Sequence, residues 1–223
     1  MIKPERWLGL FAGAALLGSA GCQGRAPSSQ ALQARIVEVP SLPAYVRLPA
    51  APEVQASEGQ LLQENSVLRT ETPGRLQVQL ADGRQFRLGG DAVLRLASQD
   101  LELERGQIIA WISPAGAGGA PLRVRTRDAT ASIVGTTVFV EASASGLTIF
   151  SWEGEVECTT GDGQRKWLRS GEQLAFSGGR WSKSRLTPQE AEARRRRSIL
   201  LNGFATPMDT LPVIERELGL QPQ

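Results

Sequence analysis

Between residues 59 and 181 the chain alternates apolar and polar residues in short runs. The clearest runs are Leu76–Leu80, Phe86–Leu88, Leu101–Glu104, Leu122–Arg125 and Thr137–Glu141. A period of two places successive side chains on opposite faces of a strand, so that one face is buried and the other meets solvent. The turn pairs between the runs are Asp82-Gly83, Gly89-Gly90, Arg105-Gly106, Asp162-Gly163, Ser170-Gly171 and Gly178-Gly179. Short strands separated by such turns predict an all-β domain.

A glycine followed by Gln or Glu and then aliphatic residues recurs along this region. The glycines are Gly59, Gly106, Gly154 and Gly171. They indicate either a weak internal repeat, as in a β-solenoid, or independent turns that each need a positive φ.

Helix is expected only at the C-terminal end. Thr187, Pro188 and Glu190 have the spacing of a capping box with Pro at the first helical position, and they predict a helix from Pro188 to about Leu200. A second short helix is expected over 211–218, ended by Gly219.

The first 22 residues read as an export signal. Lys3 and Arg6 precede an apolar run of eleven residues at 7–17, which has the length of a signal-peptide core and is too short to span a bilayer. Small residues and then Cys22 follow and resemble the lipobox of bacterial lipoproteins, although Ser19 stands where that pattern has Leu. A lipid on Cys22 and ordinary cleavage after Ala20 or Gly21 remain the two alternatives.

These features divide the chain into four parts. We expect a signal peptide at 1–21, a polar tether at 22–33, a β domain at 34–182 and a helical tail at 183–223.

The composition excludes several kinds of chemistry. The chain has no histidine, which rules out a Ser-His-Asp triad, a Cys-His pair and imidazole metal ligands. A net charge of +2 gives no strong signal for a polyanionic partner. We therefore expect a protein that is not an enzyme, with no cofactor and no metal site. Cys158 reads as a small buried hydrophobe.

Residues 57–176 resemble the FecR domain, a bacterial module that lies outside the inner membrane. The segments that carry the resemblance are Leu76–Leu80 with Asp82-Gly83, Arg105–Ile108, Val134–Thr136 with Val140, Glu153–Val156, and Leu168–Gly171. The resemblance implies a β-solenoid-like or sandwich-like fold. In the best-known members the domain helps to relay a signal to a cytoplasmic sigma-factor regulator. We expect a stand-alone exported member that lacks the cytoplasmic regulator domain.

Three arginines on one predicted strand form the candidate binding patch. Arg123, Arg125 and Arg127 share its solvent face, and Arg87 and Arg95 are expected on the solvent faces of other strands. If these strands are neighbours, the patch could hold an anionic glycan, a lipid headgroup or an envelope protein. The alternative is that carboxylates such as Glu102 and Glu104 pair with the arginines across the strands.

The sequence contains two other charged clusters. Glu153, Glu155 and Glu157 form an acidic stripe, the one enzyme-like hint, which we interpret as a solvated face. The four arginines at 194–197 are interpreted as a solvated helix face. Behind an export signal, nucleic acid is not expected as a partner of this run.

The sequence therefore predicts a lipid-anchored protein of the periplasm or cell envelope that acts as a binding or sensing module. A structural scaffold and an enzyme acting on cell-wall polymer are the competing functions.

The anchor can be tested directly. Replacing Cys22→Ser removes the acylation site, so the protein should move from the membrane fraction to the soluble fraction of the producing cells. Immunoblots of separated fractions measure this, and equal membrane retention of the variant would contradict the anchor.

Overall fold

The computed structural model describes residues 34–98, 100–113 and 120–221. The signal peptide and tether predicted at 1–33, Cys22 included, lie outside the described residues. Within the described ranges, no helix is both long enough and apolar enough to cross a membrane.

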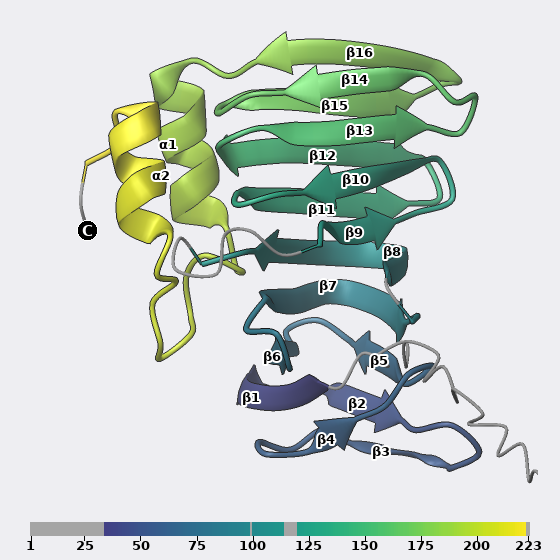
Figure 1. Ribbon diagram of the computed structural model, residues 1–223. Helices are drawn as coiled ribbons and strands as arrows, with labels where there is room; N and C mark the ends of the chain where they lie inside the picture. The colour runs from purple at the N-terminus through teal and green to yellow at the C-terminus, as the bar shows by residue number, and fades with distance from the viewer. Residues whose placement is uncertain (1–33, 99, 114–119, 222–223) are drawn as a thin grey trace, which may run out of the picture.

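The strands form one hydrogen-bonded network that is folded into two facing layers (Figure 1). Two long antiparallel strands, β7 (Gln85–Leu96) and β8 (Asp100–Trp111), belong to both layers. The first half of β7 pairs with the second half of β8 in one layer. Beyond a bend, the second half of β7 pairs with the first half of β8 in the other.

Each layer extends to both sides of this shared pair. The first layer adds β16 (Arg180–Arg185), β15 (Glu172–Ser177), β12 (Gly146–Glu153) and β11 (Thr137–Ser143) beside β8, and β6 (Arg75–Leu80), β1 (Ala34–Ser41) and β4 (Leu61–Leu62) beside β7. The second layer adds β14 (Arg165–Leu168), β13 (Val156–Thr160), β10 (Ala129–Ile133) and β9 (Leu122–Arg125) beside β8, and β5 (Val67–Thr70), β2 (Ala44–Arg47) and β3 (Glu53–Gln55) beside β7. Among the described strands, β8 and β9 alone pair in parallel. The expected all-β fold with a short helical tail is confirmed.

The core lies between the two layers and follows the alternation in the sequence. Along β10 and β13 every second residue is buried. The first layer contributes residues such as Leu76, Val78, Ile108, Val140 and Ile149 to the same core. Burial of these aliphatic side chains is the main favourable contribution to folding, at about 25 cal/mol per Å² of apolar surface.

The bend in β7 and β8 depends on close backbone approach. Gly106 has φ +90°, and a Cβ built on it would lie 2.2 Å from the Cα of Ala92. On β7 the bend uses Gly90 at φ +66° and Asp91 at φ +56°. The recurring glycines Gly59, Gly106, Gly154 and Gly171 all have positive φ, but Gly106 lies at the bend inside β8 whereas the other three lie between strands.

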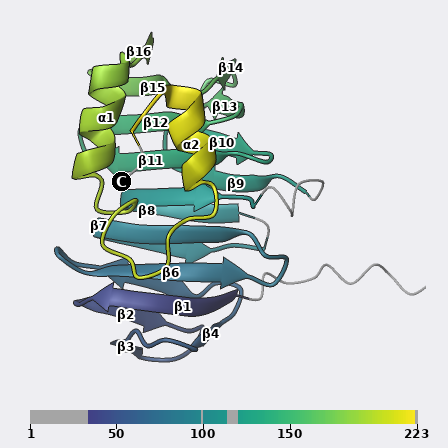
Figure 2. The same cartoon turned by 90° about the vertical axis from the view of Figure 1, so that its left-hand side faces the viewer.

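The helical tail covers the outer face of the first layer (Figure 2). Its helices are α1 (Pro188–Arg197), which has the predicted capping box at Thr187 and Glu190, and α2 (Leu211–Leu218), which Gly219 ends in the left-handed conformation. A second apolar cluster forms here. Its buried members are Ile109, Trp111, Phe150, Trp152, Ala191, Leu200, Leu201, Met208, Ile214 and Leu220.

The interpretation of the arginine run at 194–197 as a solvated face is wrong for two of its members. Arg195 is buried and pairs with Glu215 of α2, and Arg194 lies over the ring of Phe150 at 4.6 Å. Arg196 and Arg197 are exposed. Four consecutive residues span a full turn of an α-helix, so they cannot share one face.

Glycine at the bend can be tested with a matched pair of variants. Gly83 and Gly106 have almost the same φ, +87° and +90°, but a Cβ at Gly83 meets nothing within 4 Å. Gly83→Ala should therefore lower the free energy of unfolding by the backbone strain alone, about 1 kcal/mol. Gly106→Ala should lower the free energy of unfolding by about 1–3 kcal/mol more than Gly83→Ala does, because the Ala92 backbone has to move. Urea unfolding of both variants measures the difference, and equal losses would contradict the close approach.

Candidate functional site

A basic groove lies over the second layer beside the bend. It has a volume of about 740 Å³, and its floor includes Val67, Val93 and Leu103. Five arginines line it together with three carboxylates. These are Arg47, Arg95, Arg105, Arg125 and Arg127, with Glu102, Glu104 and Asp128. The excess of guanidinium groups around a partly apolar floor makes the groove suited to an anionic partner.

The structure brings three of the predicted patch residues to neighbouring strands. Arg95 on β7 pairs with Glu102 on β8, and Arg125 on β9 lies 3.8 Å from the same carboxylate. Asp100, whose side chain is 7% exposed, accepts from Arg123 and Arg125, both at 2.6 Å. The cross-strand pairing that was the alternative to a binding patch is therefore present. The Arg95 and Arg125 side chains are nevertheless 53% and 54% exposed, so an incoming anion can still reach them.

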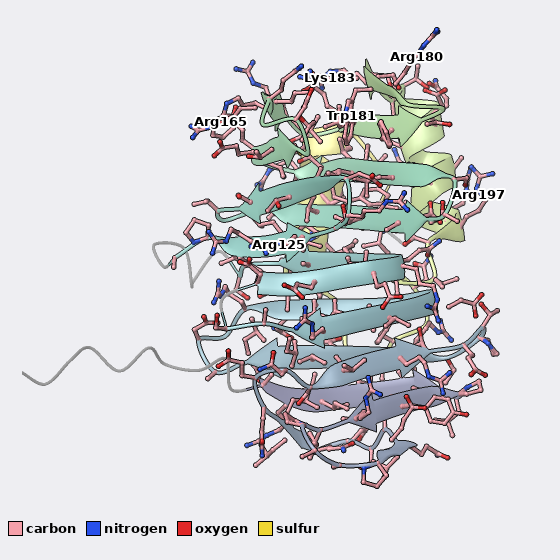
Figure 3. The ribbon with its side chains drawn as sticks, turned by 90° about the vertical axis from the view of Figure 1, so that its right-hand side faces the viewer. Arg125, Arg165, Arg180, Trp181, Lys183 and Arg197 are labelled. Atoms are coloured by element: carbon pink, nitrogen blue, oxygen red, sulfur yellow. The ribbon has the colours of Figure 1, made fainter. Side chains whose placement is uncertain are left out.

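Arg127 lies in the turn after β9 and not on the strand itself. Its side chain is 68% exposed, and its guanidinium pairs with the adjacent Asp128 at 3.2 Å. Arg47 and Arg105 complete the groove and were not among the predicted residues, because only the fold brings the end of β2 and the bend in β8 to the same groove. Figure 3 shows Arg125 on this side of the molecule, apart from the basic residues at the β14 and β16 end.

Arg87 was expected on a solvent face, and the structure corrects this placement. It is completely buried under the loop between α1 and α2. Its guanidinium donates to the Gln77 side chain at 2.8 Å, to the Leu200 carbonyl at 2.9 Å and to the Thr206 carbonyl. The ring of Phe204 lies 4.0 Å from it. Burial lowers the pKa of Arg87 to about 10. The residue holds the tail against the sheet and does not belong to the groove.

The acidic stripe does not exist as one face. Glu153 is buried at the end of β12, where it accepts a hydrogen bond from Thr137 at 2.9 Å, whereas Glu155 is exposed in the next turn. Gly154, at φ +73°, turns the chain between them. Burial raises the pKa of Glu153, and the nearby charge of Glu217 acts in the same direction. The buried Glu153 faces the tail and cannot share a cleft with Glu155.

Cys158 is fully buried in the core between the layers, as expected for a small hydrophobe. Burial raises the pKa of its thiol to about 12. Within the described ranges, no group of three or more His, Cys, Asp or Glu side chains is arranged to hold a metal ion.

The fold and the groove together define a two-layer β protein with a basic groove and a covering helical tail. The family model described as FecR protein matches residues 66–157, so this part of the chain is similar to the FecR family. The match spans β5 to the start of β13 and includes most of the groove.

Solved structures provide a second comparison. A proposed anti-sigma factor from Parabacteroides distasonis ATCC 8503 has 22% sequence identity and a TM-score of 0.51, over 61% of this chain and 67% of that one. Another proposed anti-sigma factor structure from the same organism has 24% identity and a TM-score of 0.45, and the chain covers 55% of its length. At this identity the first likeness shows a shared fold. No curated protein matches the chain.

The role of Arg87 can be tested against a neighbour on the same strand. Arg87→Met keeps the aliphatic volume but leaves the Leu200 and Thr206 carbonyls without their donor, at about 1–3 kcal/mol for each unsatisfied group. The tail should then open more often, and limited proteolysis should cut faster within 199–206. Arg95→Met, at a half-exposed position of β7, should leave the cutting rate unchanged. Equal rates in the two variants would mean that Arg87 does not hold the tail.

Proposed function

We propose that this protein is an exported, non-enzymatic regulatory module that binds or senses a component of the bacterial cell envelope. The observation that carries the proposal is the match of residues 66–157 to the FecR family model, together with a fold shared with a proposed anti-sigma factor. A regulatory module needs a surface for its partner more than it needs a reaction centre, and the basic groove supplies such a surface.

The groove favours an anionic partner. Arginine guanidinium groups match carboxylate and phosphate oxygens in geometry and charge. Pairing with Glu102, Asp100 and Asp128 fixes the orientation of several guanidinium groups before a partner arrives, which reduces the entropy cost of binding. An acidic surface of an envelope protein, an anionic glycan or an anionic lipid headgroup has the required chemistry.

Anchoring would keep the module close to its partner. In this proposal a lipid on Cys22 and the tether at 22–33 hold the β domain at the periplasmic side of a membrane. In this proposal the tether leaves the domain able to turn its groove toward the membrane or toward a neighbouring protein.

The two competing functions differ in what they require. A structural scaffold would need neither the groove nor its charge. An enzyme acting on cell-wall polymer would need two carboxylates facing one accessible cleft, and the burial of Glu153 beneath the tail argues against this.

Charge reversal in the groove tests the proposal. Arg105 and Arg127 are the best targets, because each pairs with the adjacent carboxylate, at 3.5 and 3.2 Å, and not across strands. Arg105→Glu with Arg127→Glu should weaken binding to anionic envelope fractions by about tenfold or more, and should alter transcription in the producing cells as deletion of the protein does. Binding is measured with lipid vesicles, isolated glycan and envelope proteins.

The control carries the same change in charge elsewhere. Arg165 and Arg180 lie at the far end of the sandwich, on β14 and β16, as Figure 3 shows. Arg165→Glu with Arg180→Glu should bind as the unchanged protein does. Equal losses in both double variants would indicate a general charge effect. Unchanged transcription in the groove variant and the deletion strain would favour a scaffold.

A further inference from the structure

A second cavity lies between α1 and the outer face of the first layer, on a different surface from the basic groove. Its volume is about 180 Å³, and it shares no lining residue with the groove. Trp152 lines it from β12, Phe139 and Glu141 from β11, and Arg194 and Arg197 from α1.

Two residues that line this cavity each carry a buried hydrogen-bond donor without an acceptor. The indole Nε1 of Trp152 is buried without a partner among the described residues, and so is Nη1 of Arg194. The Trp152 side chain is completely buried. Buried donors are almost always paired, and leaving one unpaired costs about 1–3 kcal/mol. Two such donors belong to residues that line one cavity, which makes this cavity the candidate place for an acceptor.

The position of Arg194 is fixed by aromatic rings. Its guanidinium lies 4.6 Å from the ring centre of Phe150 and 5.7 Å from that of Phe139. Burial lowers the pKa of Arg194, because partial removal of its guanidinium from water makes the charged form less favourable. Stacking on rings limits the rotation of the guanidinium, so its donors are already oriented before a ligand binds.

The charges around the cavity do not balance. The lining includes two guanidinium groups and one carboxylate, Glu141, which accepts a hydrogen bond from Gln107 at 2.8 Å. Among the described carboxylates, none forms an ion pair with Arg194 or Arg197. Water could accept from the unpaired donors but would leave the excess positive charge in place, whereas a monoanion would satisfy both.

We propose that this cavity binds the oxyanion of a small molecule, a carboxylate or a phosphate group. Trp152 Nε1 and the guanidinium groups of Arg194 and Arg197 are its donors. A neighbouring cavity of about 360 Å³ is also lined by Arg194 and Arg197, and it has room for the remainder of the ligand. The proposal goes beyond the envelope-binding function, because it assigns a ligand site on the opposite side of the first layer from the core.

Nitrogen NMR of the tryptophan side chains tests the proposal on the full chain. Titration with inorganic phosphate, and separately with acetate, should shift one indole signal, the one that is missing in Trp152→Phe. The two titrations also distinguish the sources, because a phosphate site and a carboxylate site will differ in the concentration at half saturation. Arg197→Gln should raise that concentration about tenfold, as expected for loss of a charged hydrogen bond.

The matched control is Arg196→Gln, the neighbouring exposed residue, which pairs with Glu192 and lines neither cavity. It should titrate like the unchanged protein. Arg194→Gln is a second variant of the site, and its dispersed spectrum shows whether α1 still folds. The proposal is overturned if neither anion shifts the Trp152 signal, which means that the cavity holds water only. It is also overturned if Arg196→Gln weakens binding as much as Arg197→Gln does.

Discussion

The close approach of Gly106 to Ala92 lets two strands serve both layers. Because β7 and β8 bend at this point, each strand has half of its length in either layer, and the two layers become one hydrogen-bonded network. The layers therefore cannot slide past one another without breaking strand pairing in both. The same bend places Arg95, Arg105 and Glu102 at one groove. Stability of the sandwich and geometry of the candidate site thus depend on the same backbone contact.

The elements whose signals are local could be predicted from the sequence. The capping box at Thr187, the stop at Gly219 and the Asp82-Gly83 turn all depend on residues within a few positions of one another, and the structure shows each of them. The placement of Arg87 could not be found in this way. Its strand alternates like any half-exposed strand, and only packing against residues more than 100 positions later decides that it is buried.

A signal for the buried outer face was nevertheless present. Residues 108–111 and 149–152 are almost entirely apolar in sequence, and their consecutive side chains are buried, whereas β10 and β13 of the second layer alternate. A run of this kind indicates a strand covered on both faces. The helical tail covers the outer face of these strands. Even this signal would not have placed Arg194 over Phe150 or paired Arg195 with Glu215, because those contacts depend on how α1 is rotated against the sheet.

Chemical labelling of Cys158 can report when the two layers of the fold separate. Its thiol is inaccessible in the core, and its high pKa leaves almost no thiolate to react. A maleimide or another alkylating reagent can modify it only in molecules whose two layers have separated. The rate of labelling at Cys158, separated from any labelling of Cys22 by peptide mapping, therefore measures how often the sandwich opens in purified protein, without any engineered probe.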